Sequence, residues 1–446
     1  MGWFPWILVG TCTAWACRDI PWPHPNPDAG KPDGGSADAS VEGGDGAPTG
    51  GECEPGTPDC QCGWGTPHVL SDEEPGTYTQ LAVTESGHAV ALWQDGTPPE
   101  DLMVSVLEPA SERWQPARAI VPDHGPNAAI DFTLLSDRDG QFWLGALWSA
   151  SVWKRFDSRS GNWSELAPLP FAGSLQLRGE RQPLLFEYPQ VGFYDVQQNV
   201  WSTAGTEPDA SRPFYEPPSF SVDDDGNIIA AWVDVRLERD WRGFPIPIPI
   251  GASARFFDRA ANAWLPVQKL TDLTQSQWIR TAFDGDSQAH VLVGETLYRF
   301  DAPSRQWSPA VSRPGTGYTQ LFARDSQGDI QWVAEACDGT ECQLVGTRFD
   351  NEADAWQAPA RLARTGADRQ ELHIQSAETT QSGLAFVLWS SLNDADAGGP
   401  ARSAWAIRLN GSGGWSAPEL VRTFDSADSP GIDRIVLNTS LADNGN

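Results

Sequence analysis

The residues best suited to binding chemistry in this 446-residue chain stand close together, in the stretch "DVRLERDWRGF". The candidate binding residues are Asp234, Arg236, Arg239, Trp241, Arg242 and Phe244. A guanidinium binds a carboxylate through two parallel hydrogen bonds, and arginine and tryptophan often anchor interfaces. The stretch is rich in arginine although the chain as a whole is acidic. We therefore expect a local positive site for an acidic glycan or another carboxylate.

Alternating proline and isoleucine follow this stretch, at residues 245–250. Proline restricts the backbone, so the loop can be held in shape before binding, which lowers the ordering cost. A second interpretation stays open: the loop folds over its own sheet as a cover, with Phe244 and the isoleucines buried.

We assign no catalytic residue and expect neither a cofactor nor a bound metal. The sequence "VDDDGN" at residues 222–227 offers oxygen ligands for calcium, but the same position elsewhere holds "TESGH" and "DRDGQ". That repetition favours a hairpin turn. Cys53, Cys60 and Cys62 could bind zinc, but the cluster lacks a clear fourth ligand.

Cys337 and Cys342 flank a tight turn in "EACDGTECQ". Their separation suits a disulfide at the end of a hairpin, in a protein exported to an oxidising compartment. The pairing of Cys53, Cys60 and Cys62 stays open, because one cysteine is left over after processing at Cys17.

The elements that must position these residues come from a repeat, seen in "RFFDRAANAWLPVQKL" and "RFDAPSRQWSPAVSR". Its tryptophans are Trp114, Trp163, Trp201, Trp264, Trp307, Trp356 and Trp415. They stand on average about 50 residues apart, which is the period of propeller blades. Each repeat contains four short strands separated by turn residues. The sequence predicts an all-β fold, a β-propeller of seven four-stranded blades, with eight or six as alternatives. We expect the repeated tryptophan to pack between adjacent sheets.

The first 17 residues resemble a bacterial signal peptide with a lipobox-like end. Cys17 is the expected lipidation site and Cys12 a rival, while a buried N-terminal strand is the alternative. Residues 18–63 are rich in Pro, Gly and Asp and predict a disordered tether, and residues 64–446 form the predicted propeller. The protein is therefore expected to be exported, and either lipid-anchored in the bacterial cell envelope or extracellular.

The formal net charge of −30 argues against a nucleic-acid partner, because phosphate repels a surface of the same sign. It also disfavours adsorption to anionic membranes, so membrane contact is expected only through the lipid anchor. The chain is expected to be a monomer.

The order "AAWVDVR…ARFFDRAANAWLPVQKL" is similar to the sialidase-like, Asp-box family of secreted β-propellers. Trp232, Asp234 and Arg236 match its first strand end, and Trp264 and Pro266 match the strand that follows. The strict Ser-x-Asp-x-Gly-x-Thr-Trp box does not occur. Kelch propellers are also loosely similar, through "YDVQQNVW" at residues 194–201, although their paired glycines are missing.

Two functions follow from this resemblance. The propeller scaffold alone implies a binding or scaffold module for a protein or glycan partner. We expect the variable loops that join the second and third strands to form its binding site. The alternative is a sialidase-like glycan-cleaving enzyme, which the resemblance would equip with three arginines, a Tyr–Glu pair and an acidic Asp. Arg236, Arg239 and Arg242 crowd one repeat, and Tyr215 and Glu216 are adjacent in sequence, so the pattern leans away from an enzyme.

Overall fold

A computed structural model gives the structure of the protein. It describes residues 6–7, 68–69, 75–84, 86–95, 101–111, 113–121, 131–137, 139–147, 151–178, 182–205, 218–239, 241–242, 244–273, 277–313, 317–325, 327–337, 342–364, 372–379, 385–393, 401–409 and 414–424. Cys17, the tether at 18–63 with its three cysteines, and Tyr215 with Glu216 lie outside these residues. Among the described residues, no helix is long and apolar enough to cross a bilayer.

The described strands from β3 to β34 form seven antiparallel sheets, each built from consecutive segments of the chain. The first contains β3 (Pro75–Val83), β4 (Ala89–Asp95), β5 (Leu102–Glu108), β6 (Arg113–Trp114) and β7 (Arg118–Val121). The second contains β8 (Asp131–Ser136), β9 (Gln141–Leu147), β10 (Ser151–Asp157), β11 (Asn162–Trp163) and β12 (Ala167–Pro168). The third contains β13 (Ser174–Arg178), β14 (Gln182–Glu187), β15 (Gln190–Asp195) and β16 (Val200–Ala204).

The remaining four sheets repeat this order. The fourth contains β17 (Ser219–Val222), β18 (Ile228–Arg239), β19 (Pro245–Asp258), β20 (Ala263–Trp264) and β21 (Gln268–Asp272). The fifth contains β22 (Ile279–Phe283), β23 (Ala289–Val293), β24 (Thr296–Asp301) and β25 (Gln306–Ser312). The sixth contains β26 (Tyr318–Arg324), β27 (Ile330–Cys337), β28 (Cys342–Asp350), β29 (Ala355–Trp356) and β30 (Ala360–Arg364). The seventh contains β31 (Leu372–Thr379), β32 (Ala385–Asn393), β33 (Ala401–Leu409) and β34 (Glu419–Phe424).

In the sheets with a fifth strand, the fourth strand position is split into two short pieces. Both β20 and β21, for example, pair with β19. The all-β class and the repeated unit of four strand positions are therefore confirmed. A further short pair joins β1 (Trp6–Ile7) to β2 (His68–Val69), and β1 falls within the residues predicted to form a signal peptide.

The turn between the third and fourth strands depends on one residue with a positive φ. Gly161, Asn199, Asn262, Arg305 and Asp354 all have φ between 49° and 69°, and each stands two residues before a repeated tryptophan. Gly and Asn tolerate this left-handed conformation well. The sharp turn returns the chain so that the tryptophan lies opposite the third strand.

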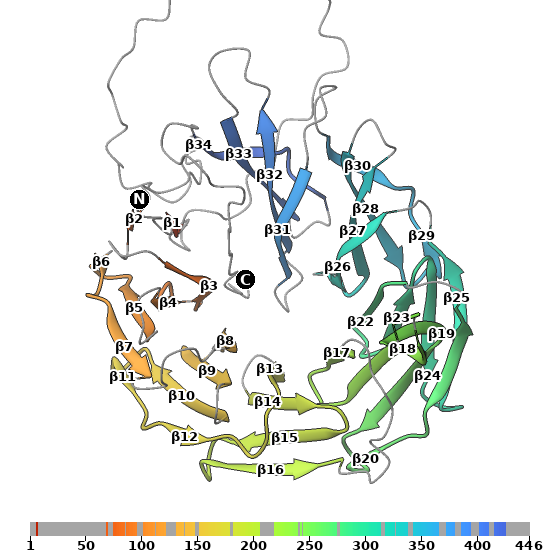
Figure 1. Ribbon diagram of the computed structural model, residues 1–446, viewed down its shortest axis with the longest axis horizontal. Coiled ribbons are helices and arrows are strands. Elements are labelled where there is room, and N and C mark those ends of the chain that lie inside the picture. Colours follow the sequence, from red (N-terminus) through yellow and green to blue (C-terminus); the bar gives the residue numbers. More distant parts are fainter. Residues whose placement is uncertain are drawn as a thin grey trace, which may run out of the picture. The chain divides into compact units, whose positions relative to one another are not determined.

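Consecutive sheets pack against one another, and Figure 1 shows them side by side in chain order. One apolar cluster joins strands of the fourth and fifth sheets, including Ile229, Ala252, Val291 and Phe300. Equivalent clusters join each other consecutive pair, from the first and second to the sixth and seventh.

The repeated tryptophans lie in these clusters. Trp264 of the fourth sheet is buried against the third sheet, and Trp307 of the fifth sheet packs into the cluster shared with the fourth. The predicted role of this residue, packing between adjacent sheets, is confirmed at six of the repeats, namely at Trp163, Trp201, Trp264, Trp307, Trp356 and Trp415.

Candidate binding site

The arginine-rich stretch forms the end of a long hairpin, made by β18 and β19. Pairing runs from Ile228 with Phe257 to Arg239 with Pro245. Within the same sheet, β17 pairs with β18 only as far as Ala231, and β21 pairs with β19 only from Gly251 onward. In the described residues, the five outermost residue pairs, from Val235–Pro249 to Arg239–Pro245, therefore pair only across the hairpin.

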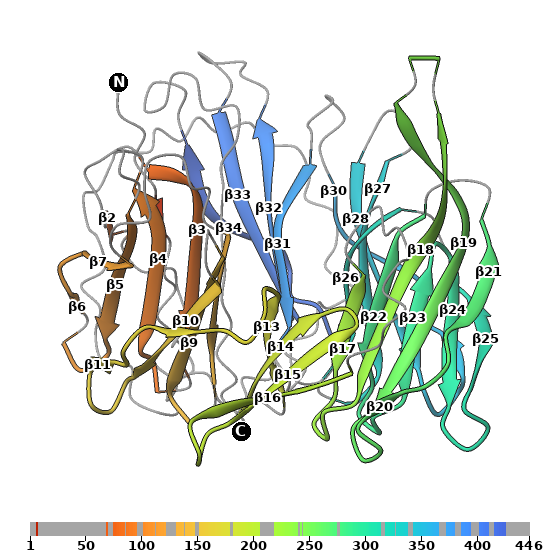
Figure 2. The same cartoon turned by 60° about the horizontal axis from the view of Figure 1, so that its bottom comes forward.

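Five pairs at the ordinary rise of a strand make an extension of about 17 Å. Figure 2 shows the two strands reaching past the ends of their neighbours in the next sheet. We call residues 235–249 the hairpin extension. The sequence places functional residues here in a loop, but the strands continue through most of it.

Asp234 fastens the base of the hairpin extension. Its carboxylate accepts a hydrogen bond of 3.0 Å from the Trp232 indole and one of 2.6 Å from the Ser253 hydroxyl. The register of the ladder shifts between Asp234 and Val235, so a bulge re-aims the strands here. A Cβ at Gly251 would lie 3.3 Å from the Asp234 carboxylate and 3.0 Å from the Thr271 carbonyl, which explains a glycine opposite. Asp234 is therefore an anchor for the hairpin, away from its tip.

The aromatic residues lie exposed at the far end. Trp241 is 85% exposed and Phe244 is 65% exposed. The Arg242 guanidinium lies 4.4 Å from the centre of the Trp241 ring, a cation–π contact that restricts both side chains. Ile246 and Ile250 are also exposed. The covering-loop interpretation predicts that Phe244 and the isoleucines are buried against the sheet. Phe244, Ile246 and Ile250 are exposed instead.

The arginines of the stretch do not converge on one point. Arg236 lies opposite Ile248 and Arg239 lies opposite Pro245, an odd number of positions apart, so their side chains leave opposite faces of the ladder. Arg236 pairs with Glu238 at 2.5 Å, with both side chains half exposed or more. A three-arginine clamp for one carboxylate is therefore not formed by these residues. Arg242, stacked on the Trp241 ring, is the arginine of the extension that lies beside an aromatic side chain in the described residues.

Buried aspartates in the turns between first and second strands were missed by the sequence reasoning. Asp137, Asp223, Asp284 and Asp325 are each at most 5% exposed and each accepts hydrogen bonds from the turn that follows. The signal was present in the recurring Asp before the turn, as in "LLSDRDG" and "SVDDDG".

These carboxylates have a structural explanation. Asp223 accepts hydrogen bonds from the backbone and the side-chain amide of Asn227, each 2.8 Å long, so "VDDDGN" is a hairpin turn as predicted. Burial raises the pKa of Asp223, although the hydrogen bonds from Asn227 oppose the rise. Burial also raises the pKa of Asp137 to about 6, against hydrogen bonds from Gln141 and Trp143. Asp284 bonds the wholly buried His290, Oδ2 to Nε2 at 2.9 Å.

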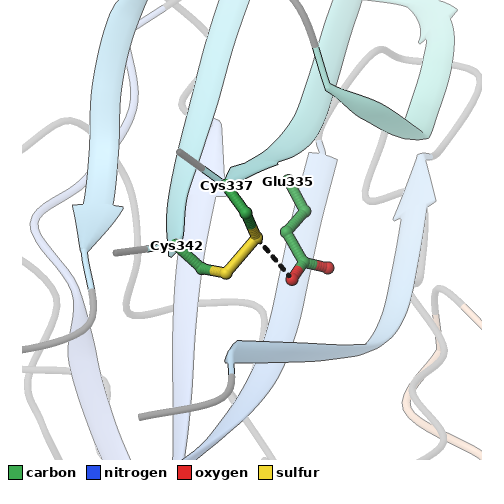
Figure 3. Close-up of side chains that lie close together, drawn as sticks. All are labelled: Glu335, Cys337 and Cys342. Carbon is green, nitrogen blue, oxygen red and sulfur yellow. Dashed lines mark hydrogen bonds between the residues drawn. A yellow bond between two sulfur atoms is a disulfide. The ribbon is translucent and has the colours of Figure 1, made fainter. Parts of the chain in front are cut away.

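Cys337 and Cys342 form a disulfide between directly opposed residues at the end of β27 and β28, as predicted. Figure 3 shows Glu335 beside it, with a carboxylate oxygen 3.6 Å from the Cys337 sulfur. The carboxylate and the two sulfurs lie within 4.8 Å of one another. Because the sulfurs are bonded to each other, they are not thiolate ligands for a metal.

No protein family model matches the chain, and no curated protein matches it. Among solved structures it is similar to a chain of the mitotic checkpoint complex, at 10% identity and a TM-score of 0.44, over 69% of this chain and 86% of that one.

A fungal alcohol oxidase of the AA5 family, in complex with copper, has 11% identity and a TM-score of 0.37, over 80% of this chain and 88% of that one. Dipeptidyl peptidase 4 of Porphyromonas gingivalis has 10% identity and a TM-score of 0.44, over 78% of this chain and 60% of that one.

Proposed function

We propose that the protein is a binding module that captures a carboxylate-bearing partner, an acidic glycan or an acidic protein segment, with the tip of its β18–β19 hairpin. One observation carries this proposal: Trp241 and Phe244 are 85% and 65% exposed, beside Arg242 stacked on the Trp241 ring. Exposed tryptophan costs free energy in water that binding can recover, and a preformed hairpin loses little entropy on binding.

The sheets provide a rigid support for this tip. We propose that the seven sheets close into a seven-bladed propeller, with six or eight blades as alternatives. Each repeated tryptophan after the first packs against the preceding sheet, so Trp114 of the first sheet is left to pack against the last. Replacing Trp114 by Ala would then destabilise the protein as much as the same change at another repeated tryptophan.

A location outside the cytoplasm would leave the tip accessible to a partner. We propose that residues 1–17 are a signal peptide, that Cys17 carries lipid, and that residues 18–63 tether the domain at 64–446 to the bacterial cell envelope. An extracellular form without the anchor is the alternative. In either place the tip meets partners outside the cytoplasm.

The proposal is tested on an array that carries acidic glycans, neutral glycans and acidic peptides. The wild-type chain is compared with Trp241→Ala combined with Phe244→Ser. Trp278→Ala is the matched control, because Trp278 is also exposed, at 43%, with Arg280 near its ring. We expect the variant with Trp241→Ala and Phe244→Ser to lose binding to acidic probes and to keep the wild-type melting temperature. The Trp278→Ala control should bind acidic probes as the wild-type chain does. Equal binding by all three proteins would refute the proposal.

A sialidase-like glycan-cleaving enzyme remains the second candidate. It requires two carboxylates, or a tyrosine and a glutamate, that converge at the reacting bond. A panel of fluorogenic glycosides tests it directly. Turnover of any of them that resists the tip substitutions would favour the enzyme over the binding module.

A further inference from the structure

The two edges of the hairpin extension differ in their capacity to accept another strand. Pro245, Pro247 and Pro249 alternate along β19, and proline has no backbone N–H. The hydrogen-bonded positions of the ladder must therefore be the residues between them, Ile246 and Ile248. The three prolines then face outward. This edge of β19 cannot donate to a further strand, which is a common way to block edge-to-edge pairing.

The opposite edge, on β18, has no such block. Ile248 and Ile246 lie opposite Arg236 and Glu238, so the N–H and C=O groups of those two residues face β19. The groups of the alternate residues, Val235 and Leu237, point the other way. In the described part of the chain, β17 pairs with β18 only up to Ala231. Leu237 is 54% exposed.

The residues along this edge are complementary to themselves. If two copies of β18 pair antiparallel about a two-fold axis at Leu237, then Leu237 meets Leu237 of the second copy. Arg236 of each copy then lies directly opposite Glu238 of the other copy. Directly opposed unlike charges stabilise an antiparallel pair.

The charges also select this register. Moving the two-fold axis to Arg236 would oppose two arginines, and moving it to Glu238 would oppose two glutamates. Like charges directly opposite are destabilising. Within one chain Arg236 and Glu238 already lie on the same side of the strand, 2.5 Å apart, so both side chains are in place for cross-strand pairs.

We propose that the protein forms a two-fold dimer in which the β18 edges of two hairpin extensions pair about Leu237. The result is a four-stranded sheet with a proline-blocked β19 strand on each side. Because both outer edges are blocked, pairing stops at two copies and does not continue into a fibre. The sequence led us to expect a monomer, and the experiment below decides between the monomer and this dimer. It uses the β18 edge, whereas the proposed partner binding uses Trp241 and Phe244.

The test is sedimentation velocity on the purified full chain over a range of concentrations. Arg236→Glu makes both positions acidic, and Glu238→Arg makes both basic. Each single variant should weaken dimerisation by about tenfold or more, because both cross-strand pairs become like-charged. Mixing the two single variants should restore the dimer, since acidic and basic strands are then opposed. The double exchange of Arg236→Glu with Glu238→Arg should also restore it.

Leu237→Pro provides a second variant that leaves the hairpin bonds intact, because residue 237 faces away from β19. We expect it to be monomeric with an unchanged melting temperature. A wild-type chain that stays monomeric at about 100 μM overturns the proposal. So does a dimer that persists in Leu237→Pro, or single charge variants that fail to dimerise when mixed.

The array measurement keeps the two proposals apart. Leu237→Pro should retain binding to acidic probes at the tip. The combined Trp241 and Phe244 variant should retain the dimer. Failure of one proposal thus leaves the other standing.

Discussion

Phe257 and Trp264 lie directly opposite each other on the third and fourth strands of the fourth sheet, with ring centroids 5.2 Å apart in an edge-to-face arrangement. The same pair recurs as Phe156–Trp163, Phe300–Trp307 and Phe349–Trp356, at 5.1, 5.1 and 5.3 Å. Each of these tryptophans also contacts the preceding sheet. The pair therefore links the turn between the third and fourth strands of one sheet to the packing of that sheet against the one before it.

Replacing Trp264 by Ala is expected to lower the free energy of unfolding by about 3–5 kcal/mol, because a large side chain is removed from a close-packed interface. The change also leaves the Pro189 carbonyl without its indole donor, now 2.9 Å away. Denaturant unfolding followed by circular dichroism measures the loss. Trp241→Ala is the control, since that ring is 85% exposed and its loss should change stability by about 0.5 kcal/mol or less. Similar losses for both would mean that the packing role is wrong.

Asp137 should make stability fall as the pH rises. Burial raises its pKa from 3.8 to about 6, so the folded state holds this proton more tightly than the unfolded state does. The resulting stabilisation is fully present below about pH 4 and is lost as the pH rises through about 6. A shift of this size corresponds to roughly 3 kcal/mol.

The measurement is the melting temperature of wild type and Asp137→Asn between pH 4 and pH 7. The asparagine cannot ionise, so the variant should gain stability relative to wild type as the pH rises across this range. A difference that stays constant over the range would contradict the raised pKa.

The disulfide should contribute modestly to stability. Cys337 and Cys342 are five residues apart in sequence, and closing so short a loop is worth about 2 kcal/mol in the chain-entropy account. The double substitution to serine should lower the free energy of unfolding by about that amount without changing the fold. Peptide mapping after alkylation of the native protein checks the bond itself, and two alkylated cysteines there would disprove it.

Cys17 should be the residue that carries lipid. Metabolic labelling with a fatty-acid analogue is expected to mark the wild-type protein and to disappear in Cys17→Ser. Cys12→Ser serves as the control and should leave the label in place. Label that persists in Cys17→Ser would move the assignment to Cys12 or away from both.

Much of the architecture could be predicted from the sequence because it depends on short-range patterns. Alternating apolar residues predict strands, and the Asp and Gly of "VDDDGN" predict the turn that Asp223 closes. The tryptophan about every 50 residues predicts a repeated contact. The disulfide between Cys337 and Cys342 could be predicted because the two cysteines are only five residues apart in the sequence. The sequence by itself determined these features, since each depends on residues within one hairpin or on a period along the chain.

Only the tertiary structure decided which edges and faces remain open. The sequence could not show that strands continue through residues 235–239 and 245–249, because proline usually argues against a strand unless its nitrogen faces an edge. The separate roles of Asp234 and Trp241 depend on the bulge at Val235 and on where β17 and β21 end. Exposure of Leu237 follows from the same distant strand ends. Such features depend on contacts between residues far apart in the sequence, and local sequence patterns do not report such contacts.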